Sequence, residues 1–223
     1  MWSLGKLEEE IKACLESELD SLLSERAAIA TLVHVFPSLR VKRALSTLRQ
    51  TQKILIGLGE TLIGKEKTLL DSVAYLFWVE VSTNLLADIL IIMLAAKGHA
   101  FHIEPDDKYR FIRHATSIED LESPSVSLAM KLGFLDKCGV SCFNKFVDRE
   151  LRNKIAHGSY EIDDKGAFFT FEKKKGNLKK KQVDLRQKLD RLTIFNSSLM
   201  HKIKLAVDKT KKSQSSVGFK RHS

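Results

Sequence analysis

Three residues with complementary chemistry, Arg152, Asn153 and His157, lie close together in the chain, directly before Gly158. An imidazole can donate and accept protons near neutral pH, and a guanidinium is a fixed cation that binds two phosphate oxygens at once. An amide can orient either group by hydrogen bonding. Such a set suits general acid–base chemistry on a phosphate ester, with the arginine stabilising the charge of the transition state. These residues are therefore the candidate catalytic residues.

A single helix from Val140 to Ala156 is predicted to present this set. Its apolar side chains recur every fourth residue and comprise Phe143, Val147, Leu151 and Ile155. Gly158 is suited to the left-handed position that follows a helix. Arg149, Asn153 and His157 also recur every fourth residue, so they share a face away from the apolar stripe.

Arg152-Asn153 followed by His157 at the end of a helix resembles the R-x4-6-H signature of the HEPN superfamily. Many members of that superfamily are metal-independent endoribonucleases that act as toxins, phage-defence effectors or RNA-processing enzymes. Others have lost catalysis and serve as binding or dimerisation modules. The resemblance implies a helical domain that forms a homodimer through the face carrying the motif, with no cofactor or metal in the reaction.

The resemblance also implies a role for each motif residue. The RNA 2′-hydroxyl would attack the adjacent phosphodiester, with His157 as general base or acid, Arg152 stabilising the transition state and Asn153 orienting one of them. A catalytically inactive HEPN module that binds RNA or nucleotide, or that pairs with a nucleotidyltransferase, remains open, as do an antitoxin partner and a purely structural dimer. In one toxin branch a tyrosine two residues after the histidine is modified by its partner. Tyr160 stands three residues after His157 and departs from that pattern.

The most apolar part of the chain runs from Leu69 to Ala96 and carries one polar stripe, because Glu80, Asn84 and Asp88 repeat at intervals of four. Charges on that stripe argue against a membrane span and favour a central core helix with one functional or interface-facing edge. By the resemblance, one of these three residues lines the cleft beside the motif. The alternative, a paired polar group within the core, stays open.

The chain has a net charge of +9 that is concentrated at its C-terminal end. From Lys173 onward there are 16 Lys and Arg against 3 Asp and Glu, whereas the preceding residues carry a net charge of −4. This asymmetry predicts a polyanionic partner, RNA rather than a membrane. The candidate RNA-binding residues are Lys173, Lys174, Lys175, Lys179, Lys180 and Lys181. They can bind phosphates but cannot read bases, and a solvated lysine face is the alternative.

Three cysteines, Cys14, Cys138 and Cys142, form an odd set at no disulfide-framework spacing. Together with the absence of a signal-peptide pattern, they predict a reducing, cytoplasmic location. Cys138 and Cys142 lack a matching ligand pair, so all three are interpreted as buried thiols and no metal site is predicted.

The N-terminal half is predicted to contain a helix over residues 4–36, a second helix from about Leu39, and a bend at Gly59–Gly64. That bend nearly matches a phosphate-binding loop, but Glu66 occupies the position of the magnesium-binding Ser or Thr. Residues 98–123 are interpreted as a loop or lid with a short helical turn at 106–113. A short helix is predicted to open at Ser123-Pro124.

After Gly158 the two-residue periodicity predicts a β-hairpin over residues 160–172, with a third short strand at Gln182-Val183. Asp184 should cap a long final helix, and the chain beyond Lys209 is expected to be disordered. The predicted fold is mainly α. It is a HEPN-like bundle of five or six helices in one domain over residues 1–209, with a β-hairpin at about 160–183 and a basic tail at 210–223.

Overall fold

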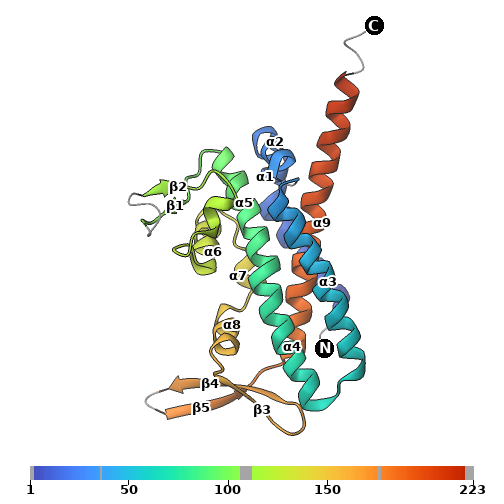
Figure 1. The fold of residues 1–223 in the computed structure, drawn as a ribbon, viewed down its shortest axis with the longest axis vertical. Coiled ribbons are helices and arrows are strands. Elements are labelled where there is room, and N and C mark those ends of the chain that lie inside the picture. The colour runs from blue at the N-terminus through green and yellow to red at the C-terminus, as the bar shows by residue number, and fades with distance from the viewer. Residues whose placement is uncertain (1–2, 36, 106–111, 175–176, 219–223) are drawn as a thin grey trace.

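The computed structural model describes residues 3–35, 37–105, 112–174 and 177–218, without the side chains of 39, 173, 174 and 213–218. Helices dominate, and two small antiparallel sheets accompany them (Figure 1). The helices are α1 (Leu4–Ser24), α2 (Arg26–Val35), α3 (Leu39–Thr61), α4 (Gly64–Phe77), α5 (Asn84–Ala96), α6 (Leu128–Lys137), α7 (Cys142–Phe146), α8 (Arg149–Ala156) and α9 (Leu185–Gly218). The strands are β1 (His102–Ile103), β2 (Arg113–His114), β3 (Tyr160–Ile162), β4 (Phe168–Lys174) and β5 (Asn177–Gln182). The predicted mainly α class with a small hairpin is confirmed.

Helices α4 and α5 form one continuous apolar helix through a π-helical turn, Trp78–Thr83. By length and composition this helix is long enough to cross a membrane, and 72% of its most apolar window is buried against the rest of the chain. The residues Leu85–Leu94 of α5 are all buried, and α5 packs against α2 and α6. The helix therefore has the central place in the core that its sequence predicts.

The predicted helix over residues 4–36 is divided at Glu25, which takes an extended conformation between α1 and α2. Its carboxylate pairs with Lys97 Nζ at 2.6 Å, at the far end of α5. The break lets both helices turn their apolar sides toward α9. The bend predicted at Gly59–Gly64 is confirmed, because α3 ends at Thr61 and Gly64 opens α4 with a positive φ of 56°.

Residues 98–123 contain the short pair β1–β2, in which His102 lies opposite His114, and a 3₁₀ turn at Glu119–Glu122. The helical turn predicted at 106–113 lies largely outside the described residues. The helix predicted to open at Ser123-Pro124 begins instead at Leu128. Ser127 Oγ caps it by accepting a hydrogen bond from the Met130 amide at 3.3 Å, so the prediction chose the wrong serine.

The predicted helix from Val140 to Ala156 is two helices, α7 and α8, separated by Val147 and Asp148. Val147 takes an extended conformation, and Asp148 then caps α8 through Leu151 N, which donates to Asp148 Oδ1 at 3.0 Å. The predicted apolar stripe is nevertheless buried along its whole length, at Phe143, Val147, Leu151 and Ile155. The predicted helix end holds as well, since Gly158 has a φ of 65°.

Strands β3, β4 and β5 form the predicted hairpin and a longer third strand than expected, running from Asn177 rather than from Gln182. This sheet lies beside α8 and the first turn of α4, where Thr68 Oγ1 donates to the Gly166 carbonyl at 2.7 Å (Figure 1). Asp184 caps α9 as predicted, accepting from the Gln187 amide at 2.9 Å. Helix α9 continues to Gly218, so the expected disorder is wrong for 210–218, and 219–223 lie outside the described residues.

Candidate functional site

The start of α8 is fixed by a buried tyrosine from α4. The Tyr75 hydroxyl donates to the Asp148 carbonyl at 3.1 Å and accepts from the Asp148 amide at 3.0 Å. Burial raises the pKa of Tyr75, and the charge of Asp148 adds to the effect, so the hydroxyl keeps the proton that it donates. Tyr75 thereby gives the Asp148 amide a partner at the break between α7 and α8 and adds a second hydrogen bond to the Asp148 carbonyl, which also accepts from the Arg152 amide at 3.0 Å.

The Asp148 carboxylate adds a second anchor, from α9. Lys188 Nζ lies 2.9 Å from Asp148 Oδ2. Burial alone would raise the pKa of Asp148, but the hydrogen bond from the Leu151 amide and the charge of Lys188 outweigh it and lower that pKa below its ordinary value. An ionised Asp148 therefore caps α8 and attaches it to α9.

Arg152 points from α8 to the π-helical turn of the central helix. Its Nε donates to Glu80 Oε1, and its Nη1 donates to Asn153 Oδ1 at 2.9 Å. Both members of the Arg152–Glu80 ion pair are partly exposed, at 32% and 40% of their side-chain surface. The structure thus brings together two of the predicted motif residues and the first residue of the polar stripe.

A side chain of α9, Asn196, stabilises the π-helical turn that carries Glu80 by hydrogen bonding. Asn196 Nδ2 donates to the Trp78 carbonyl at 3.4 Å and to Thr83 Oγ1 at 3.0 Å. Thr83 Oγ1 also donates to the Trp78 carbonyl, and both side chains are buried. A π turn inserts one extra residue into a helix and shifts the face on which the following residues lie, and such turns are frequent at functional sites. The position of Glu80 opposite Arg152 therefore depends on Asn196.

His157 occupies the capping position after α8 and is exposed. Among the described residues its imidazole makes no hydrogen bond or ion pair, and Arg152 does not contact it within the chain. Gly158 donates its amide to the Ile155 carbonyl at 3.1 Å and turns the backbone away into β3. The imidazole is therefore open to a ligand or to a second molecule.

A polar cavity of about 540 Å³ lies on the other side of α8 and is lined by both Arg149 and Asn153. Cationic side chains dominate its wall, which also includes Lys145, Lys188 and Arg191, against the carboxylates of Asp148 and Glu150. Arg149 lines this cavity, which is not the cleft beside the motif for which Arg149 and Tyr160 were also candidate lining residues. Arg152 and His157 are absent from the lining, so Asn153 is the residue that joins the cavity to the motif.

Asn84 and Asp88 belong to a different network from Glu80. Lys131 Nζ lies 2.7 Å from both Asn84 Oδ1 and Asp88 Oδ1, and Arg40 Nη2 lies 2.9 Å from Asp88 Oδ2. Asp88 and Lys131 are 0% and 2% exposed. The structure therefore supports the alternative reading of Asp88 as a paired polar group in the core, and not the prediction that it lines the cleft.

The remaining predicted residues lie in the three-stranded sheet. Tyr160 stacks on Phe168, with ring centroids 5.1 Å apart, as part of the packing between β3 and β4. On β5, Lys180 pairs with Glu161 at 2.7 Å and lies over the Phe169 ring, and Lys181 pairs with Glu172 at 3.0 Å. Every residue of β5 is exposed, Lys179 included. The side chains of Lys173 and Lys174, and the whole of Lys175, lie outside the described residues.

Sequence reasoning missed three side chains that shape this site: Tyr75, Asn196 and Lys188. Each contacts the site from an element distant in sequence, and none belongs to a recognisable motif. Comparison with known proteins adds no assignment: no family model matches the chain, and no curated protein or solved structure matches it.

Proposed function

We propose that this chain is a metal-independent endoribonuclease of the HEPN type, acting as a toxin, in defence or in RNA processing. The observation that carries the proposal is that Glu80 and Asn153 position Arg152 on α8, the short helix that the exposed His157 directly follows. A positioned guanidinium and an open imidazole on the same short helix supply the two kinds of group that phosphodiester cleavage by a 2′-hydroxyl requires without a metal ion.

The reaction follows from these two groups. His157 takes the proton of the 2′-hydroxyl, whose oxygen attacks the adjacent phosphorus as the bond to the 5′-oxygen of the next nucleotide breaks. The leaving 5′-oxygen takes a proton from solvent, and the imidazolium returns its proton to solvent. Arg152 shares its hydrogen bonds between Glu80 and the phosphate oxygens and stabilises their growing charge. Acid–base catalysis supplies only about 10²- to 10⁴-fold, so charge stabilisation and positioning must supply the rest. The product carries a 2′,3′-cyclic phosphate.

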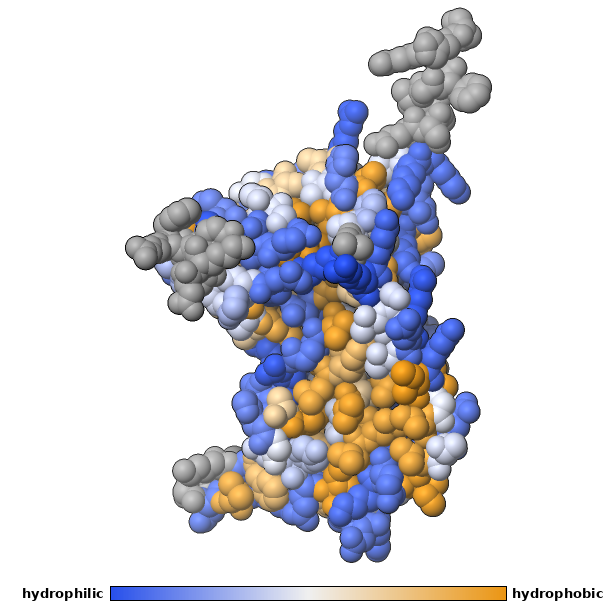
Figure 2. All heavy atoms as spheres, in the orientation of Figure 1, coloured by the Kyte–Doolittle hydropathy of each residue, from blue (hydrophilic) through white to orange (hydrophobic). Residues whose placement is uncertain are grey.

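A homodimer would complete the cleft. Leu69 and Val73 of α4 are exposed apolar residues that lie one turn apart on the same face of that helix. Ile54 and Leu58 of α3 are also exposed and lie one turn apart, and Figure 2 shows an apolar area over the lower part of α3 and α4. Apolar patches of this kind mark interfaces. This area is a candidate interface for a second subunit, whereas a cleft with two copies of Arg152 and His157 requires pairing through the face of α8 that carries the motif.

The basic surfaces fit an RNA substrate. Exposed strand β5 offers lysines to phosphates, and the cavity beside α8 offers Arg149, Lys188 and Arg191 next to Asn153. Contacts to phosphate position an RNA without selecting its sequence.

A second candidate is a catalytically inactive HEPN module that binds RNA or nucleotide, or that pairs with an antitoxin or a nucleotidyltransferase. Two observations favour it: Arg152 is already paired with Glu80, and the cation-rich cavity includes Asn153 but neither Arg152 nor His157. In this case the cavity would hold a phosphate group and no bond would break.

Incubation of the purified protein with a mixed RNA pool, with and without EDTA, separates the two candidates. The endoribonuclease yields fragments with 2′,3′-cyclic phosphate ends at the same rate in both conditions. The binding module retains intact RNA in a filter-binding or mobility assay and releases no fragment.

A further inference from the structure

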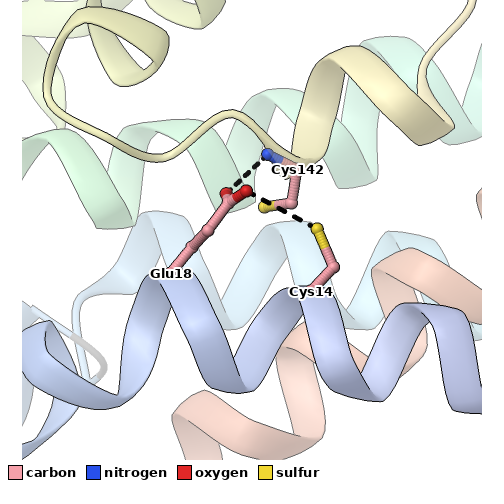
Figure 3. A group of neighbouring side chains, drawn as sticks. All are labelled: Cys14, Glu18 and Cys142. Atoms are coloured by element: carbon pink, nitrogen blue, oxygen red, sulfur yellow. Dashed lines mark hydrogen bonds between the residues drawn. The ribbon is translucent and has the colours of Figure 1, made fainter.

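Two cysteines and a glutamate from two distant parts of the chain meet between α1 and α7 (Figure 3). Their ligand atoms, Cys14 Sγ, Cys142 Sγ and a Glu18 carboxylate oxygen, all lie within 4.8 Å of one another. Cys14 and Cys142 are buried, at 5% and 0% exposure, and Glu18 is half-buried. All three cysteines are free thiols.

The glutamate lies between the two thiols and is an ionised carboxylate. Glu18 Oε1 accepts from Ser141 Oγ at 2.7 Å and from Cys14 Sγ at 3.6 Å, and Oε2 accepts from the Cys142 amide at 2.6 Å. Burial raises the pKa of Glu18, but the hydrogen bonds from Ser141 and Cys142 outweigh it and lower that pKa below its ordinary value.

We propose that Cys14, Glu18 and Cys142 form a binding site for a thiolate-preferring divalent metal, zinc above all, that joins α1 to α7. Two sulfurs at about 2.3 Å and one carboxylate oxygen at about 2.0–2.2 Å are three of the four ligands of a tetrahedral zinc site. Because Glu18 is only half-buried, a water molecule can supply the fourth ligand of the metal. On metal binding, both thiols would lose their protons to solvent. One of these is the proton that Cys14 Sγ now donates to Glu18 Oε1.

The surroundings match a metal site in charge and in access. Lys145 Nζ lies 3.6 Å from Cys14 Sγ and would balance the negative charge that remains on two thiolates, one carboxylate and a divalent cation. Ser141 Oγ and the Cys142 amide hold the Glu18 carboxylate in place, as outer partners of metal ligands generally do. Lys145 is exposed and Glu18 is half-buried, so an ion can enter from the surface beside them. Zinc accepts both cysteine sulfur and carboxylate oxygen as ligands, and thiolates select it over magnesium and calcium.

The consequence for the fold is local. The site lies at the start of α7, and α7 leads through Val147 and Asp148 into α8. A metal bound there would fix the arm that carries Arg152 to α1. The proposal does not depend on RNA cleavage and is tested without it.

The test uses the full chain, reduced and freed of metal, titrated with Co²⁺ and then with Zn²⁺. We expect one Co²⁺ per chain, with the visible absorption bands of tetrahedral cobalt and a thiolate-to-cobalt charge-transfer band, both removed by Zn²⁺. Cys14→Ser and Cys142→Ser should lose the charge-transfer band and weaken binding by at least about 100-fold, whereas Glu18→Gln should weaken it by about tenfold or more. Cys138→Ser is the matched control, because Cys138 is a half-buried thiol outside the cluster.

Three results would overturn the proposal. The first is a reduced protein that takes up no cobalt. The second is a charge-transfer band that survives Cys14→Ser and Cys142→Ser, and the third is one that disappears in Cys138→Ser. Circular dichroism of each variant shows whether it folds, and Glu18→Gln keeps the test open if a serine variant does not, because its thiols are intact.

Discussion

Arg152 of α8 donates a hydrogen bond from Nε to Glu80 in the π-helical turn of the central helix. This contact joins the motif to the polar stripe, and it sets the direction of a guanidinium that would otherwise be free to move. Because the pair is partly exposed, it adds at most about 1 kcal/mol to the free energy of unfolding. Its contribution is to position Arg152 rather than to stabilise the fold.

Glu80→Ala should therefore lower kcat for RNA cleavage by about 10- to 100-fold, since a misplaced catalytic group costs this much, and leave the melting temperature nearly unchanged. Glu80→Gln keeps an oxygen that can accept from Arg152 and should retain more activity than Glu80→Ala. Single-turnover cleavage and thermal melting measure the two effects. Faster cleavage by Glu80→Ala would show instead that Glu80 competes with the phosphate for Arg152.

Asp148 should make the stability of the chain depend on pH. Its pKa is lowered in the folded state, so the stabilisation that its charge provides is present above the unfolded pKa of about 3.9 and is lost as pH falls through the lower folded value. Asp148→Asn keeps the cap of α8 but loses the charge facing Lys188. Asp148→Ala loses both and should cost about 1–2 kcal/mol at neutral pH.

Urea unfolding of the three proteins between neutral and acid pH checks this prediction. The difference between wild type and Asp148→Asn should shrink toward zero as the pH falls through the lowered folded pKa of Asp148. A difference that stays constant over this range would mean that Lys188 does not stabilise the Asp148 charge.

The lysines of the sheet should contribute unequally to RNA affinity. Each phosphate contact to single-stranded RNA adds about 0.7 to the salt slope of the binding constant. Replacing all six lysines with Gln should weaken binding and flatten that slope. Lys179→Gln should lower the slope more than Lys180→Gln or Lys181→Gln, because Glu161 and Glu172 already neutralise the latter two.

Filter binding over a range of salt concentrations measures these slopes. Lys12→Gln is the control, as Lys12 is an exposed lysine on α1 that pairs only weakly with Glu16, at 3.9 Å. A slope that is unchanged in the variant without the six lysines would make β5 a solvated face with no part in RNA binding.

The sequence was sufficient where a feature depends on local periodicity. The four-residue repeat ending at Ile155, the glycine after His157 and the alternation after Tyr160 predicted the buried stripe, the helix end and the hairpin. The same repeat did not reveal the break between α7 and α8. Phe143 and Val147 keep their places on the stripe, and what stabilises the break is Tyr75, which is 73 positions from Asp148 in sequence.

Contacts between distant elements account for the other differences. The sequence does not distinguish the three residues of the polar stripe, Glu80, Asn84 and Asp88. In the structure, Glu80 pairs with Arg152, whereas Asp88 pairs with Lys131 and Arg40. Cys14 was judged to be one of three unrelated buried thiols, since only the packing of α1 against α7 brings it to Cys142. Such pairings depend on tertiary structure, which the local pattern of a single sequence does not specify.

Cleavage of a mixed RNA pool in EDTA by wild type, Arg152→Lys, Arg152→Ala and His157→Ala tests the proposed function most directly. Lysine keeps the charge but loses the planar fork that binds two phosphate oxygens, so we expect Arg152→Lys to be strongly impaired and both alanine variants to be inactive. All four should melt at similar temperatures and form the same dimer, because both side chains lie off the buried stripe of α8. Wild-type protein that leaves every RNA intact, with a His157→Ala variant that unfolds or loses the dimer, would contradict the proposal and favour a structural role for the motif.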